Sequence, residues 1–198
     1  GGGGGLAQVD NLYSYEFDEI NAYFDAGNIT ALNSQSAFST SAWINYSGTP
    51  TTSSHVILSG GSSSTNRFWV QLKSSTEIRY GSGSASAYDV TVSTMSSGTW
   101  YHIATVHNGT SLDIYLNGIK QGATVTVVAP STQIGNNFKI GEYFSPVGYL
   151  WNGYLDEIGL FNVALTQEQI ESIYNATTTG KTADLSSLSP VAWYRMGD

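Results

Sequence analysis

The chain has 198 residues, a formal net charge of −8 and 11% charged residues, against the roughly 25% that is usual for globular domains. Its 7 Lys and Arg residues are too few for a basic face that neutralises nucleic-acid phosphates or binds an anionic membrane surface. No apolar run approaches the ~20 residues of a membrane span, so membrane insertion is not expected. The absence of Cys excludes disulfides and thiolate metal sites.

Runs of alternating or aromatic-rich residues recur along the whole chain, and Gly-, Ser-, Thr- and Asn-rich stretches separate them. Many short strands without interleaved helices indicate a sandwich or a barrel. The predicted strands are Leu12–Phe17, Ala22–Phe24, Phe38–Asn45, His55–Ser59, Arg67–Lys73, Glu77–Tyr80, Ala87–Val92, Trp100–His107, Ser111–Leu116, Gln121–Val128, Asn137–Glu142, Gly153–Phe161 and Val191–Arg195.

Two tight turns are visible in the middle of the chain, at Asn108-Gly109 and Asn117-Gly118. Asn-Gly favours the type I′ geometry that matches the twist of paired strands. The three strands around these turns are therefore predicted to form an antiparallel meander.

One segment, Thr166–Tyr174, has the spacing of a short helix instead. Thr166 is a good N-cap, and Gln169 three residues later completes a capping box. Leu165, Ile170, Ile173 and Tyr174 fall roughly on one face, which would hold the helix against the sandwich.

Residues 1–11, which begin with five glycines, are expected to be a linker or flexible tail, and residues 12–198 a single β-sandwich domain. Residues 190–198 are expected to form a closing strand beside the N-terminal strand. The alternative is that this last segment begins a following module.

Four segments in this order resemble laminin G-like domains of the concanavalin A-like lectin and glucanase superfamily, to which pentraxins are also related. They are Tyr15–Gly27, Phe38–Ile44, Gly98–Gly118 and Trp151–Ile170. The resemblance implies an all-β fold, a two-sheet antiparallel jelly-roll sandwich with one short helix near its end. Trp43, Trp100, Ile103 and Val106 stand at positions suited to the core between two such sheets.

Some members of this superfamily are glycosidases, whose carboxylates alternate along one strand as Glu-x-Asp-x-Glu. No such phrase occurs here. Asp18-Glu19 and Asp156-Glu157 are adjacent pairs, and adjacent strand residues point to opposite faces. We therefore assign no catalytic residue, and we expect a structural role for His102.

Many relatives bind one Ca²⁺ through an Asp near the start and an Asp of a late strand. The matching residues are Asp18 and Asp156, and Glu19 and Asn21 could add ligands toward the six to eight oxygens that Ca²⁺ requires. Glu19 and Ala22 stand where the family phrase commonly has Gly and a second Asp. The resemblance thus implies a possible Ca²⁺ site, with a degenerate or empty site as the alternative.

Sugar recognition uses aromatic faces together with a few polar groups. The aromatic loop Tyr143–Asn152 offers Tyr143, Tyr149 and Trp151 with Asn152 as a polar partner, and Trp69 and Tyr80 are second choices. The alternative is that many of these aromatic side chains belong to the core.

The sequence thus favours a non-catalytic recognition module that binds a glycan or glycoprotein, in a larger extracellular or virion-surface protein with an adhesion role. A structural protein–protein assembly module, with homo-oligomers through the parent protein, is the alternative. A glycoside hydrolase ranks behind both.

Overall fold

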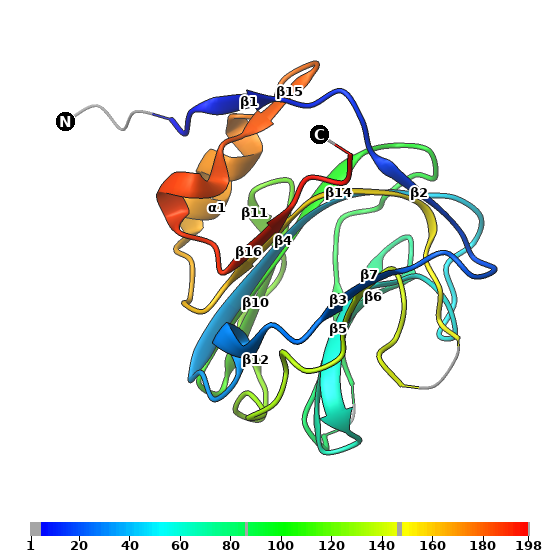
Figure 1. The fold of residues 1–198 in the computed structure, drawn as a ribbon, viewed down its shortest axis with the longest axis vertical. Helices are drawn as coiled ribbons and strands as arrows, with labels where there is room; N and C mark the ends of the chain where they lie inside the picture. Colours follow the sequence, from blue (N-terminus) through cyan, green and yellow to red (C-terminus); the bar gives the residue numbers. More distant parts are fainter. Residues whose placement is uncertain (1–4, 86, 146–147, 198) are drawn as a thin grey trace.

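The computed structural model describes residues 5–85, 87–145 and 148–197. In these ranges the chain forms a six-stranded and an eight-stranded antiparallel sheet that face each other, with a two-stranded ladder and a short helix outside them (Figure 1). The strands are β1 (Gln8–Asp10), β2 (Tyr15–Asp18), β3 (Phe24–Gly27), β4 (Ala37–Tyr46), β5 (Val56–Ser63), β6 (Asn66–Ser74), β7 (Glu77–Ser82), β8 (Tyr88–Thr91), β9 (Tyr101–Asn108), β10 (Ser111–Leu116), β11 (Ile119–Lys120), β12 (Val125–Thr126), β13 (Phe138–Ile140), β14 (Asn152–Phe161), β15 (Lys181–Ala183) and β16 (Ala192–Tyr194).

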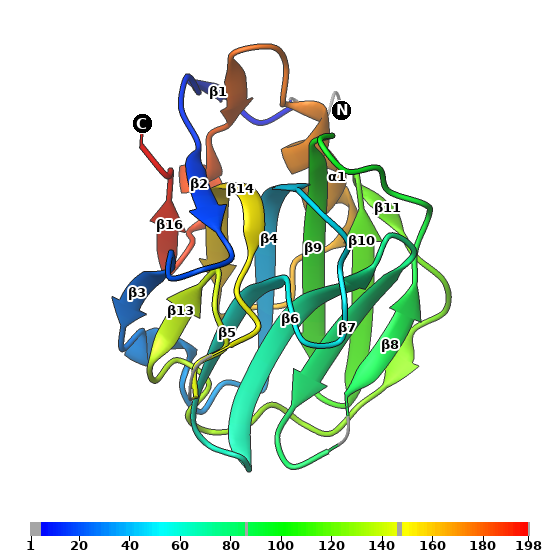
Figure 2. The same cartoon turned by 90° about the vertical axis from the view of Figure 1, so that its right-hand side faces the viewer.

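The eight-stranded sheet has the order β11-β10-β9-β4-β14-β16, with β12 beside β10 and β2 beside β14. The six-stranded sheet has the order β3-β13-β5-β6-β7-β8, and Figure 2 looks onto its outer face. This arrangement confirms the predicted all-β jelly-roll sandwich.

The main core lies between the sheets, and strand alternation directs every second side chain into it. On β4, Ala42 and Ile44 face the interior, so Trp43 between them points to the outer face of the eight-stranded sheet. Trp100 lies just before β9 and is 38% exposed. The expectation that both tryptophans belong to the core between the sheets was therefore wrong. Ile103 does lie in that core, whereas Val106, also expected there, belongs to a cluster on the outer face of the eight-stranded sheet.

A second buried cluster lies on the outer face of the eight-stranded sheet, beneath helix α1 (Gln167–Asn175). Ile170 and Ile173 of the helix belong to it with Val106 of β9. Thr166 caps the helix, and Gln169 completes the capping box, as predicted. Two short 3₁₀ turns, Thr30–Leu32 and Leu185–Leu188, complete the helical elements of the described residues.

The predicted meander is present as β9, β10 and β11. Asn117 and Gly118 have φ of 51° and 78°, the positive values that a type I′ turn requires. At the other turn Asn108 pairs with Ser111, so the loop residues are Gly109 and Thr110, one position later than predicted.

Both ends of the described chain are tied to the sandwich. Gln8–Asp10 forms β1, which pairs with β15, so the expectation of a linker through residue 11 was wrong for these residues. β16 pairs with β14 along the edge that also carries β2. In the described part of the chain the helix lacks the length and apolar character needed to cross a membrane.

Candidate functional site

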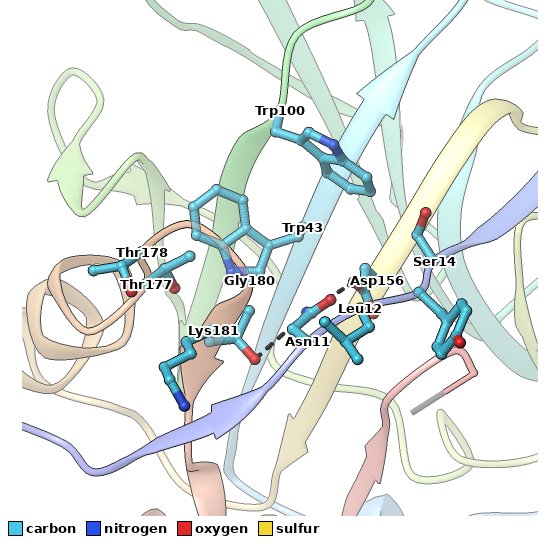
Figure 3. A pocket seen from close by; sticks show the side chains of 12 residues that line it. Asn11, Leu12, Ser14, Trp43, Trp100, Asp156, Thr177, Thr178, Gly180 and Lys181 are labelled. Carbon is cyan, nitrogen blue, oxygen red and sulfur yellow. Dashed lines mark hydrogen bonds between the residues drawn. The ribbon is translucent and has the colours of Figure 1, made fainter.

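Two of the pockets in the described residues open on opposite sides of the sandwich. The Trp43 pocket, of about 320 Å³, lies on the outer face of the eight-stranded sheet, where the indoles of Trp43 and Trp100 flank one side (Figure 3). The Trp69 pocket, of about 300 Å³, lies on the outer face of the six-stranded sheet. Its lining residues are Thr52, Val56, Arg67, Trp69, Gln71, Arg79, Tyr143 and Tyr149.

The floor of the Trp69 pocket follows from the alternation of β6. Phe68, Val70 and Leu72 are buried in the core, so the residues between and before them project from the outer face. These outward residues are Arg67, Trp69 and Gln71. β7 adds Arg79, which lies opposite Gln71 in the strand register.

The indole of Trp69 lies across Gly81, its register partner on β7. A Cβ at Gly81 would meet the six-membered ring of Trp69 at 2.0 to 2.2 Å, so the ring takes the space that a side chain would occupy. The ring of Tyr143 meets that of Trp69 edge-on, with centroids 5.5 Å apart. Gly81 thus allows a flat aromatic floor on the sheet.

The loop after β13 supplies the tyrosine wall of the pocket. Val56 N–H donates to the carbonyl of Tyr149 at 3.0 Å, which fixes the loop to the start of β5. Tyr149 has φ of 61°, an uncommon value for a non-glycine residue, and its side chain is 40% exposed. Its ring lies 5.7 Å from that of Tyr143. Pro146 and Val147, in the same predicted loop, lie outside the described residues.

The two arginines of the pocket differ in their partners. Arg79 donates from Nε and Nη2 to both carboxylate oxygens of Asp89, at 2.8 and 3.0 Å. Lys73 also donates to Asp89, at 2.8 Å. Arg67 donates from Nη1 to the hydroxyl of Tyr143 at 2.8 Å and from Nε to the carbonyl of Gly83 at 3.1 Å.

Acid is expected to weaken the fold through Asp89. The hydrogen bonds from Arg79 and Lys73 lower its pKa to about 2, from 3.8. Because the folded-state pKa is depressed, this stabilisation is complete above 3.8 and is lost as the pH falls through about 2. In urea unfolding at pH 5 to 2, Asp89→Asn should lose less stability across this window than the original chain. An NMR titration of the Asp89 carboxyl with a midpoint near 4 would contradict this.

The structure brings together two of the four predicted glycan-binding residues, Tyr143 and Tyr149. Trp151 is fully buried, with its ring edge-on to His55 at 5.4 Å, so assigning it to an exposed binding surface was wrong. Asn152 begins β14 and donates to Glu19 at 3.0 Å, outside the Trp69 pocket. Of the second choices, Trp69 lines the pocket and Tyr80 is buried in the core.

Sequence reasoning missed the two arginines and Gln71. A signal was present in R-F-W-V-Q, residues 67–71, where a predicted strand alternates so that every residue on the face of Trp69 is polar or aromatic. Arg79 had no signal of its own, because its place beside Gln71 depends on the register of β6 and β7.

The residues predicted for calcium do not fit one shared site. Asp18 pairs with Asn152 in the register of β2 and β14, which places Asp156 four residues further along, a distance of roughly 13 Å. Oδ1 of Asp18 accepts the backbone N–H groups of Ile20 and Asn21, which lowers the pKa of Asp18 and commits that oxygen to a turn. In the described ranges no three His, Asp or Glu side chains are grouped so that they could hold a metal ion.

The adjacent pair Asp156 and Glu157 does not point to opposite faces, contrary to prediction. The register of β14 and β4 shifts after Asp156, and Glu157 has φ of 47°. This bulge turns both carboxylates to one side, where Asn11 Nδ2 donates to Asp156 at 2.9 Å and to Glu157 at 3.3 Å. Asp156 lines the Trp43 pocket (Figure 3).

Glu157, next to Asp156, is buried and accepts hydrogen bonds from three residues late in the chain. Trp193 Nε1 donates to Oε2 at 2.6 Å, and Thr182 donates to Oε1 at 2.9 Å. Arg195 Nε donates to Oε1 at 3.2 Å. Burial raises the pKa of Glu157, and these donors oppose the shift. Its surroundings make it a structural anchor for β15 and β16.

The comparisons with known proteins place this fold in a family. The Laminin_G_3 family, described as the concanavalin A-like lectin/glucanases superfamily, matches residues 18–171, and the chain belongs to it. This confirms the predicted laminin G-like family. No curated protein sequence matches the chain significantly.

Similar solved structures include carbohydrate-binding domains. Domain 4 of AbnA, a GH43 extracellular arabinanase from Geobacillus stearothermophilus in complex with arabinotriose, has 21% identity and a TM-score of 0.63, over 85% of this chain and 81% of that one. The CBM40 of the Ruminococcus gnavus IT-sialidase, bound to α2,3 sialyllactose, has 14% identity and a TM-score of 0.62, over 86% and 99%. A heptameric SAP-like pentraxin from Limulus polyphemus has 18% identity and a TM-score of 0.63, over 80% of each chain.

Proposed function

We propose that the chain is a non-catalytic carbohydrate-binding module whose ligand occupies the Trp69 pocket. The observation that carries this is the gathering of Trp69, Tyr143 and Tyr149 with hydrogen-bonding groups in a pocket of about 300 Å³ on an open sheet face. Aromatic surfaces with a few fixed polar groups suit a ring that is apolar on its faces and polar at its edge. The resemblance of the fold to domains from arabinanase and sialidase supports the assignment.

The carboxylates at the Trp69 and Trp43 pockets support binding without hydrolysis at these two places. Glycoside hydrolysis commonly requires two carboxyl groups flanking the scissile bond. The lining residues of the Trp69 pocket include no Asp or Glu. Among the described residues that line the Trp43 pocket, Asp156 is the only one with a carboxylate. Its neighbour Glu157 is 3% exposed and is occupied by hydrogen bonds from Trp193, Thr182 and Arg195.

The experiment is a glycan array probed with the original chain and with Trp69→Ala. We expect binding by the original chain and at least a tenfold loss in the variant, because the floor of the pocket is removed. Tyr149→Ala should weaken binding as well. Trp100→Ala is the matched control, since this exposed tryptophan lies at the other pocket. Equal losses for Trp69→Ala and Trp100→Ala, or no binding by the original chain, would overturn the proposal.

An extracellular location is part of the same proposal. It is supported by the similarity to a domain of an extracellular arabinanase and by the weakly charged, Ser- and Thr-rich composition. Secretion assays on the full-length parent protein would test it directly.

A second candidate function is assembly with further copies of this chain. It is favoured by a run of exposed apolar side chains near the start, with exposures of 39 to 76%. They are Leu12, Tyr13, Tyr15, Ile20, Tyr23 and Phe24. Light scattering would reveal a stable oligomer, and a monomer at all concentrations would dismiss this candidate.

A further inference from the structure

The charge pattern of the Trp69 pocket points to a class of sugar. The chain has seven Lys and Arg residues, and all of them lie in the described ranges. Six form ion pairs with carboxylates, at 2.5 to 3.3 Å. Arg67 is the one Lys or Arg of the seven that has no carboxylate of the described residues within 4 Å, although the chain carries a net charge of −8. An uncompensated cation in so acidic a chain is a feature of this pocket.

Arg67 is held in a fixed orientation rather than extended into solvent. Its guanidinium carbon lies 4.9 Å from the ring centroid of Trp69, the arrangement of a cation–π contact. Nη1 and Nε are engaged by Tyr143 and Gly83, so the plane of the guanidinium is set from two sides. The stack of Gly81, Trp69 and Arg67 therefore presents the cation at the pocket.

Donors remain for a ligand at this position. The two N–H groups of Arg67 Nη2 have no acceptor among the described residues, and those of Nη1 have only the Tyr143 hydroxyl. Because that hydroxyl accepts from Arg67, its own hydrogen can be donated elsewhere. Burial raises the pKa of Tyr143, which keeps this hydrogen in place at neutral pH. Arg79, in contrast, is already paired side-on with Asp89.

We propose that the Trp69 pocket binds an acidic sugar, one that carries a carboxylate or a sulfate, and that Arg67 with the hydroxyl of Tyr143 receives the anionic group. A planar guanidinium matches the oxygens of such groups with two parallel hydrogen bonds. No Asp or Glu is among the described residues that line the pocket, so no lining carboxylate repels such a group. The inference rests on the proposed carbohydrate-binding function and narrows it to a class of ligand.

The test is an array that holds uronic-acid, sialic-acid, sulfated and neutral oligosaccharides. We expect the original chain to bind acidic members, more weakly as salt is added, and Arg67→Gln to lose at least tenfold. Arg67→Lys should recover only part of the loss, because it keeps the charge without the planar fork. Lys120→Gln is the control, since it removes the same charge from a residue paired with Asp113 on the other sheet.

The outcomes separate this inference from the function it rests on. Binding to neutral sugars only, lost in Trp69→Ala, would keep the carbohydrate-binding function and overturn the acidic class. Acidic binding that Arg67→Gln leaves unchanged would overturn the role of Arg67. No binding to any member would overturn the carbohydrate-binding function itself. Carboxyl-reduced versions of a bound uronic or sialic oligosaccharide show which anionic group is recognised. Reduction removes the carboxylate and leaves any sulfate in place, so binding should be lost only if the pocket recognises the carboxylate.

Discussion

Replacing Glu157 with alanine is expected to lower the free energy of unfolding by about 3 kcal/mol, because it breaks a buried ion pair with Arg195 and leaves Trp193 and Thr182 without their acceptor. Removing one partner of a buried ion pair costs about 3 to 5 kcal/mol. The low end of this range applies here because the side chain of Arg195 is 26% exposed and regains contact with water. In a domain of this size the loss corresponds to a fall in Tm of about 6 to 12 °C. Urea and thermal unfolding measure both quantities.

Glu77→Ala is the matched control for that experiment. Glu77 also forms an ion pair, with Lys73 at 3.3 Å, but its side chain is 34% exposed. Surface pairs of this kind contribute up to about 1 kcal/mol, so the control should unfold close to the original chain. If both variants lost the same stability, the buried contacts of Glu157 would not anchor the end of the chain as argued. Loss of near-UV circular dichroism from Trp193 in Glu157→Ala alone would support the anchor.

Substituting alanine for Gly81 should remove ligand binding and cost about 1 to 3 kcal/mol of stability, because the new methyl group overlaps the indole of Trp69. The ring must leave its place on the sheet, and Arg67 loses the surface on which it lies. Glycan binding and urea unfolding are the two measurements.

A double-mutant cycle makes the cause of that loss visible. In the Trp69→Ala background the methyl group meets no ring, so Gly81→Ala should cost much less there than in the original chain. Equal costs in both backgrounds would show that Gly81 is required by the β7 backbone and not by the indole. Binding should be absent in both Trp69→Ala chains.

Local signals in the sequence were sufficient for several elements of the fold. The helix at 167–175 was predictable because its capping box lies within four consecutive residues, Thr166 to Gln169. The turn at Asn117-Gly118 was predictable because few residue pairs adopt two positive φ values. In both cases the residues that decide the structure are neighbours in the chain.

The errors at the candidate site come from contacts between residues far apart in sequence. Trp151 follows the aromatic loop, yet its backbone N–H donates to the carbonyl of Gly141 and its ring enters the core beside His55. Trp43 follows strict alternation, but which face of β4 is inward depended on the six-stranded sheet that packs against Ala42 and Ile44. The bulge after Asp156 has no marker residue such as glycine at Glu157, so the shared direction of the two carboxylates could not be read from D-E-I.

The position of the first and last strands bears on how the pocket would meet a ligand in a larger protein. β16 belongs to the eight-stranded sheet, and β1 pairs with β15 in the ladder outside the two sheets (Figure 1). The Trp69 pocket lies on the outer face of the six-stranded sheet. Neither of these strands contributes a residue to the lining of that pocket. A copy attached to a surface through either end would therefore leave the pocket lining free, and several copies on one support could engage a polymeric glycan at once, with avidity beyond that of a single pocket.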